Sequence, residues 1–266
     1  MSVKPEKRVA DGPIWVTGAG GLLGSALLRS GAAGQGRVHL DVTDTDAVER
    51  MIGTHRPRAV IHCAAFTHVD ACGPEHWAVN VTAAETLAAR VPTWLVSSNY
   101  VFDGPGPHSP SSPRCPCLRY GVQKAAAEDA VLAHGGHVVR TGWLFGPGGT
   151  NFPSRLPELL AAGPVQALES WPVQPTWADD LAAYLMTLPK GVTHAVGGEQ
   201  TTWADFSRAL AVKMGLPADR VLGVSKVKSM GPRPQDARLL GHALPGWPQR
   251  IDPLLEASRR LGEDSA

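Results

Sequence analysis

Apolar residues in the first half of the chain fall into short, unbroken runs separated by segments with helical spacing. The runs lie at residues 13–16, 59–65, 93–97 and 137–140. Uninterrupted apolar strands are typical of a parallel sheet covered on both faces, because both sides of each strand are then buried. Strands that alternate with helices in this way predict an α/β fold built on a doubly wound parallel sheet.

Two segments between these runs have the spacing of amphipathic helices. Residues 45–55 form the first, and Asp44 stands where a carboxylate caps a helix N-terminus. Residues 74–90 form the second, and we expect one face of it to pack into the core. The apolar residues on that face are Trp77, Val81, Ala84, Leu87, Ala88 and Val91.

The pattern changes after residue 150, where the elements become shorter and prolines and tryptophans more frequent. We expect two domains, residues 1–150 and a smaller C-terminal lobe of residues 151–266 that can return a strand or a helix to the sheet. In the second, helical spacing recurs at residues 157–162, 176–188, 202–214 and 254–261, with a strand at 193–196.

The composition excludes several classes of partner. Of 266 residues, 43% are hydrophobic and 18% charged, as in ordinary globular proteins. A net charge of +1 gives no electrostatic attraction for nucleic acid or for an anionic membrane surface. No apolar run reaches the roughly 18 residues of a membrane span, and the polar N-terminus lacks the apolar core of a signal peptide. We expect a cytoplasmic protein with neither a nucleic-acid nor a membrane partner.

The cysteines do not indicate a metal site. Cys115 and Cys117 are spaced too tightly for a usual zinc pair, and no cluster of histidines and cysteines follows them. Cys63 lies in an apolar run and is expected to be a small core residue. No metal ligand is therefore predicted.

Three glycines mark the turn after the first strand. Gly18, Gly21 and Gly24 form a G-x-x-G-x-x-G register directly before an apolar helix. Glycines let the backbone approach a pyrophosphate, and the helix N-terminus supplies N–H donors and a positive dipole end. Such a triplet is often only a turn, but its position between a strand and a helix predicts a dinucleotide site.

A carboxylate follows in the region of the second strand. Asp41 stands just past a strand end, where it can contact the adenine or the ribose of a dinucleotide. Because residues 31–36 are few, this strand is expected to be very brief or fused with the next. No arginine follows the strand to hold a 2′-phosphate, so this region leaves NADH and NADPH open.

Tyr120 and Lys124 lie on one face of a predicted helix, because they are four residues apart in a segment rich in helix formers. The charge of Lys124 is expected to lower the pKa of Tyr120 from its reference value of about 10. A tyrosine prepared in this way can exchange a proton near neutral pH. By itself the pattern also fits an exposed tyrosine beside a solvated lysine, which is the usual case for chance occurrences.

Several motifs follow in one order over nearly the whole chain. Ser98, at the end of a central strand, lies twenty-two residues before Tyr120. The others are VTGAGGLLG at 16–24, LDVTD at 40–44, AAFTHVD at 64–70, SSNYVFDG at 97–104, RTGWLFG at 140–146, NF at 151–152, PT at 175–176, DDLA at 179–182 and RP at 233–234. In this combination the chain resembles the extended short-chain dehydrogenase/reductase superfamily, and within it the family of dTDP-4-dehydrorhamnose reductases.

The resemblance implies a Rossmann-like NAD(P)-binding domain followed by a substrate-binding lobe. It implies a hydride transfer from NADPH or NADH, with NADPH preferred, to the 4-keto group of a dTDP-activated 6-deoxysugar in deoxysugar biosynthesis. Tyr120 would protonate the developing alkoxide, and Lys124 would hold the nicotinamide ribose. Ser98, where the family usually carries threonine, would polarise the carbonyl oxygen.

The resemblance also implies the binding residues. Those for the cofactor are Gly18, Gly20, Gly21, Leu22, Leu23, Gly24, Asp41, Val42, Ala64, Ala65, Thr67, Tyr120 and Lys124. Those for the substrate are Ser98, Asn99, Tyr100, Trp143, Asn151 and Arg233. The alternatives are a core tryptophan for Trp143, a surface arginine for Arg233 and a helix cap for Asn151.

Some positions depart from the family's pattern. Asn99 replaces an aspartate, which exchanges a charged acceptor for a group that also donates. If this side chain contacts sugar hydroxyls, the preferred sugar differs from the rhamnose precursor. The acidic metal-binding positions that some members use in dimerisation are not apparent, which leaves a homodimer open.

Two alternatives stand beside a nucleotide-sugar 4-ketoreductase. One is a non-catalytic NAD(P)-binding regulatory subunit similar to the β subunit of methionine adenosyltransferase, which retains much of the same motif set. The complete set of Ser98, Tyr120 and Lys124 argues against it. The other is an epimerase or dehydratase of the superfamily. Dehydratases carry an acidic pair beside the catalytic hydroxyl, and Ser98 followed by Asn99 lacks that pair.

Overall fold

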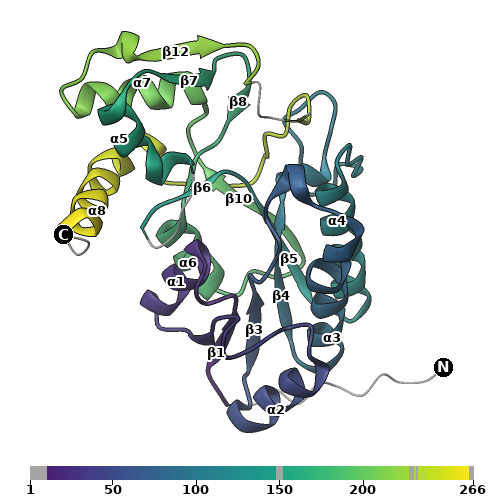
Figure 1. The fold of residues 1–266 in the computed structure, drawn as a ribbon. Coiled ribbons are helices and arrows are strands. Elements are labelled where there is room, and N and C mark those ends of the chain that lie inside the picture. Colours follow the sequence, from purple (N-terminus) through teal and green to yellow (C-terminus); the bar gives the residue numbers. More distant parts are fainter. Residues whose placement is uncertain (1–10, 148–151, 228–230, 232, 264–266) are drawn as a thin grey trace.

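A seven-stranded sheet forms the centre of the protein, in a computed structural model that describes residues 11–147, 152–227, 231 and 233–263 (Figure 1). The strand order is β13-β10-β5-β4-β3-β1-β2, and every neighbouring pair is parallel. The strands are β1 (Ile14–Thr17), β2 (Ala33–Gln35), β3 (Ala59–His62), β4 (Thr93–Ser98), β5 (His137–Thr141), β10 (Val192–Gly197) and β13 (His242–Leu244). The predicted doubly wound α/β fold is confirmed.

Helices cover both faces of this sheet. α1 (Leu22–Arg29) and α6 (Ala178–Met186) pack together on one face, where buried leucines and alanines from both helices meet β1 and β3. α2 (Thr45–His55), α3 (Ala83–Arg90) and α4 (Arg119–Ala133) cover the other face (Figure 1). Burial on both sides explains why the strand sequences are apolar without alternation.

A smaller lobe lies beyond the carboxyl ends of the strands, at the top of Figure 1. Its aromatic core joins Phe145, Trp171, Trp203 and Phe206. Its helices are α5 (Phe152–Ala162), α7 (Trp203–Lys213) and α8 (Ile251–Glu263), and its strand pairs are β7 (Val165–Leu168) with β12 (Val221–Val224) and β8 (Pro172–Val173) with β11 (Thr201–Thr202). A third pair, β6 (Leu144–Phe145) with β9 (Thr176–Trp177), connects this lobe to the sheet. In the described part of the chain, no helix is long and apolar enough to cross a membrane.

The helix expected at residues 74–90 is broken in the structure. A 3-10 turn (Pro74–His76) and a π-helical turn (Ala78–Thr82) precede α3. A π turn contains more residues than an α turn and therefore rotates the side chains before it away from the expected face. Trp77 is consequently 45% exposed, and its predicted core position is wrong, whereas Val81 and Leu87 are buried as expected. The predicted cap at Asp44 is confirmed, because its carboxylate accepts the N–H of Ala47 at 3.0 Å.

A buried charge network joins α4 to the sheet. The carboxylate of Glu128, fully buried, accepts from the guanidinium of Arg140 on β5 at 2.9 and 2.7 Å and from the hydroxyl of Ser97 on β4 at 2.5 Å. Arg114, from the loop before α4, donates to the same carboxylate at 3.1 Å. Since Arg140 also donates to His194 on β10, the network ties the helix to three neighbouring strands.

We expect Glu128→Gln to lower the free energy of unfolding by about 3–5 kcal/mol, because the guanidinium of Arg140 is then buried without its counter-charge. Urea denaturation measures this change. The matched control is Asp129→Asn, which removes an exposed partner of Arg114 and should cost less than about 1 kcal/mol. Equal decreases in the free energy of unfolding for the two variants would show that the buried carboxylate stabilises the protein no more than the exposed one.

Candidate active site

A cleft of about 1250 Å³ opens at the carboxyl ends of the strands. The chain runs from β1 outward to β2 and then returns to β3 on the other side of β1. In doubly wound sheets such a reversal of strand order leaves a crevice in which ligands bind. The loops that follow β1, β2, β3, β4 and β5 all contribute lining residues, so the cleft follows from the sheet topology.

The glycine turn forms one wall of the cleft as predicted from its register. Gly18 has φ +71°, and a Cβ at this position would lie 2.8 Å from the backbone nitrogen of Ala64. A Cβ at Gly24 would lie 2.1 Å from the carbonyl oxygen of Gly18, so α1 can approach the turn only without a side chain there. At Gly20, which lines the cleft, a Cβ would meet open space. The backbone surface therefore fits the close approach of a pyrophosphate.

The second strand is very brief, which is one of the two alternatives that the sequence left open. β2 ends at Gln35, and Arg37, two residues later, lines the cleft together with Asp41 and Thr43. The expectation that no arginine follows this strand is therefore wrong. Hydrogen bonds from the Thr43 hydroxyl and N–H lower the pKa of Asp41, and the nearby Arg37 charge adds to this shift.

Ser98, Tyr120 and Lys124 all line the same cleft. Ser98 is the last residue of β4, and its hydroxyl accepts the N–H of Tyr100 at 3.1 Å. Tyr120 and Lys124 lie in the first turns of α4, four residues apart on its buried face. The ammonium of Lys124 donates to the carbonyl of Val96 at 2.8 Å, which fixes the helix against β4. The three predicted catalytic residues thus come together although β4 and α4 are separate elements.

Burial dominates the pKa values of this group. It raises the pKa of Tyr120 to about 12, while a hydrogen bond with Ser98 acts in the opposite direction. The expectation that Lys124 lowers the pKa of Tyr120 is wrong. The lysine donates to the carbonyl of Val96, and desolvation is the largest cause of the shift in the tyrosine pKa. Burial also lowers the pKa of Lys124 to about 8, against the attraction of Glu128. Near neutral pH, Tyr120 therefore keeps its phenolic proton, and Lys124, one helical turn further along α4, is mostly charged.

The aromatic substrate candidates lie where the lobe meets the cleft. Trp143 follows β5 with φ 50°, an uncommon conformation for a bulky residue, and lines the cleft. Its ring meets those of Tyr100, Trp171 and Trp203 edge-on, with centroid distances of 6.1, 5.3 and 4.8 Å. Tyr100 lines the cleft as well. Trp143 thus packs against the lobe core and also lines the cleft. Both alternatives for this residue, a core tryptophan and a residue of the site, describe part of its surroundings.

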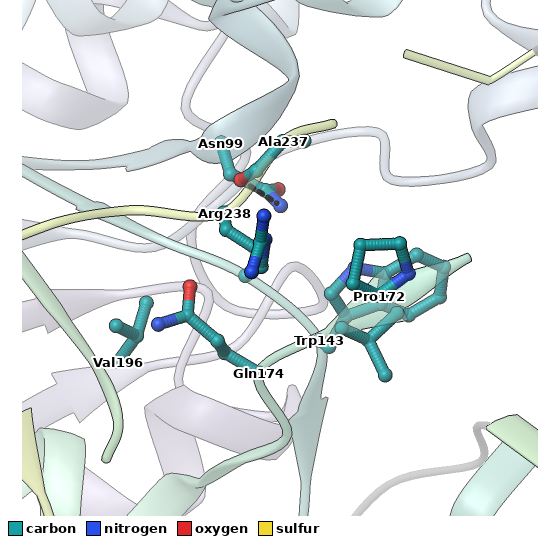
Figure 2. A pocket seen from close by; sticks show the side chains of 9 residues that line it. Asn99, Trp143, Pro172, Gln174, Val196, Ala237 and Arg238 are labelled. Carbon is teal, nitrogen blue, oxygen red and sulfur yellow. Dashed lines mark hydrogen bonds between the residues drawn. The ribbon is translucent and has the colours of Figure 1, made fainter. Parts of the chain in front are cut away.

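The other substrate candidates differ in their surroundings. Arg233 is not among the residues that line the cleft: its guanidinium donates to the carboxylate of Asp70 at 2.5 and 2.7 Å and hydrogen-bonds Tyr100, which does line it. Asn99 is 6% exposed, and its amide donates to the carbonyl of Ala237 at 3.0 Å (Figure 2). Asn151 lies outside the described residues.

The remaining cofactor candidates also line the cleft, and the structure adds residues that the sequence did not reveal. The predicted ones that line it are Gly21, Leu22, Leu23, Val42, Ala64, Ala65 and Thr67. Cys63, expected in the core, lines the cleft too. Phe152, Pro153 and Trp203 of the lobe line it as well; Phe152 belongs to the NF motif at 151–152, whereas no local motif in the sequence marks Pro153 and Trp203.

The comparisons with known proteins agree with this architecture. The family described as RmlD substrate binding domain matches residues 12–245. A dTDP-4-dehydrorhamnose reductase of Streptomyces griseus is 38% identical over 72% of this chain and 73% of its own length. A dTDP-4-keto-6-deoxy-D-glucose reductase of Streptomyces niveus is 33% identical over 78% of this chain and 83% of its own. The fold is similar to that of a Bacillus anthracis dTDP-4-dehydrorhamnose reductase solved in complex with NADP, with a TM-score of 0.86, 24% identity and coverage of 93% and 99% of the two chains.

Proposed function

The chain belongs to the family of the RmlD substrate binding domain, and we propose that it is an NAD(P)H-dependent reductase of the 4-keto group of a dTDP-activated 6-deoxysugar. One observation carries this proposal: Ser98, Tyr120 and Lys124 line the same cleft as the glycine turn. The cleft volume of about 1250 Å³ exceeds the roughly 300–1,000 Å³ of a usual small-molecule site, as expected where a dinucleotide and a nucleotide sugar meet.

The side chains of this group suit a carbonyl reduction. A bound reduced nicotinamide supplies the hydride that forms the new C–H bond at C4. The Ser98 hydroxyl, which donates a long hydrogen bond of 3.4 Å to Asn99 Oδ1 in this structure, turns its O–H to the keto oxygen when substrate binds. Tyr120 transfers the proton of its Oη to that oxygen as negative charge develops on it. The raised pKa of Tyr120 keeps this proton in place at neutral pH. Lys124, anchored at Val96, contributes a positive charge to the site and holds the ribose.

The surrounding residues supply binding. The turn at 18–24 holds the pyrophosphate, and Arg37 at the end of β2 suits a 2′-phosphate, which supports a preference for NADPH. Trp143 and Tyr100 hold the sugar. Arg233 meets the substrate phosphates after exchanging its carboxylate partner Asp70. The regulatory-subunit alternative gains no support, since the relatives are named as reductases. A homodimer and a cytoplasmic location stay predictions.

Tyr120→Phe should lower kcat by about 10²- to 10⁴-fold, because it removes only the proton donor and keeps the ring. Cofactor oxidation with a dTDP-4-keto-6-deoxysugar measures this loss, and the KM for NADPH should stay within about twofold. The control is Tyr184→Phe, which changes a tyrosine stacked on His242 that does not line the cleft and should leave kcat unchanged. Normal turnover by Tyr120→Phe would disprove the mechanism.

Arg37→Ala should raise the KM for NADPH by about 10- to 100-fold through the loss of charged hydrogen bonds to the 2′-phosphate, with little change for NADH. Initial rates with each cofactor separate the two effects. The matched control is Arg50→Ala, which removes an exposed arginine of α2 that pairs with Asp44 and does not line the cleft. A parallel change in the KM of both cofactors would exclude Arg37 as the discriminating residue.

A further inference from the structure

The segment 233–240 crosses from the sheet domain to the lobe and is held from both sides. On the sheet side, the Asp103 carboxylate accepts the N–H of Gln235 at 2.7 Å, and the His108 backbone bonds Arg238 and Leu240 at 2.8 and 2.7 Å. On the lobe side, the Gln174 amide accepts the N–H of Leu239 at 2.8 Å and donates to its carbonyl at 3.2 Å. The same segment begins with Arg233, whose guanidinium is also held by the carboxylate of Asp70.

Asn99 is the contact of this segment that is nearest to the chemistry. Its Nδ2 donates to the carbonyl of Ala237 at 3.0 Å (Figure 2). Its Oδ1 accepts a long hydrogen bond of 3.4 Å from the hydroxyl of Ser98. The donor end of the amide thus contacts Ala237 and its acceptor end contacts Ser98. One side chain therefore joins the segment to the hydroxyl that the proposed reaction uses.

Asn99 lines the cleft, but on the side of Gly142 and Arg238 its surroundings leave no room for a sugar hydroxyl. A Cβ at Gly142 would lie 2.8 Å from the Asn99 amide, which shows how closely that backbone packs against it. Arg238, Gln174 and Trp143 line the other side of the crevice in Figure 2, and this crevice has no space for a water molecule. The donor of Asn99 is thus satisfied by the protein itself, and an aspartate here could not make the bond to Ala237.

We propose that Asn99 is a positioning residue that fastens the segment 233–240 to the loop bearing Ser98, and so aligns Arg233 and Ser98 with respect to each other. The kinetic part of this inference rests on the proposed function. The fastening itself does not, because it concerns contacts within the protein.

The decisive variant is Asn99→Leu, which keeps the shape of the side chain and removes both hydrogen bonds. Hydrogen exchange of the backbone N–H groups of Gln235, Leu239 and Leu240, measured without substrate, should become about tenfold faster. With a dTDP-4-keto-6-deoxysugar, the KM for that substrate should rise about tenfold and kcat should fall several-fold, while the KM for NADPH stays unchanged. If this variant does not fold, Asn99→Asp, which keeps an acceptor beside Ser98 but has no donor, should give the same faster exchange.

The matched control is Gln174→Glu, which removes one amide donor to the same segment at Leu239 but touches no catalytic residue. It should speed exchange and raise the substrate KM without lowering kcat. Unchanged exchange in Asn99→Leu would overturn the fastening, and an identical effect of both variants on kcat would overturn the link to Ser98. Wild-type protein that reduces no keto-sugar would refute the proposed function, while the exchange data would still decide the role of Asn99.

Discussion

The polar contacts along one face of α4 are the constraint on which the site depends. Tyr120, Lys124 and Glu128 follow one another at intervals of four residues and are all buried. Lys124 is bonded to Val96 and Glu128 to Ser97 and Arg140, so two of the three fix the helix against β4 and β5. The third is thereby held near Ser98 at the end of β4. A helix placed by buried ionic contacts carries its proton donor to a defined position, since leaving such charges unpaired is costly.

The same burial decides the chemistry of the group. Desolvation raises the pKa of Tyr120 to about 12 and lowers that of Lys124 to about 8. The tyrosine therefore holds its proton at neutral pH, which suits a donor in a reduction, and the lysine stays mostly charged. The lobe closes the cleft with aromatic side chains, and segment 233–240 joins it to the sheet domain through Asn99 and Gln174.

Local sequence patterns predicted the fold and much of the cleft, because strand order brings the glycine turn, Ser98 and Tyr120 to one sheet edge. They did not predict what depends on distant contacts. The bond from Asn99 to Ala237 spans 138 residues, and the exposure of Trp77 follows from a π turn that no residue type marks. The expectation that no arginine follows the second strand was wrong because β2 has only three residues, Ala33–Gln35, and their sequence does not mark where the strand ends. The raised pKa of Tyr120 could not be predicted either, because it depends on burial, and the four-residue spacing of Tyr120 and Lys124 gives no information about burial.

The most direct test of the account follows the hydride itself. The purified protein is incubated with a dTDP-4-keto-6-deoxysugar and NADPH in which both hydrogens at C4 of the nicotinamide are deuterium, and the sugar product is examined by NMR and mass spectrometry. The account predicts a single deuterium at C4 of the sugar, on one face, with a hydroxyl in place of the keto group. A reduced sugar without deuterium at C4, or no reduction of any such substrate, would contradict it.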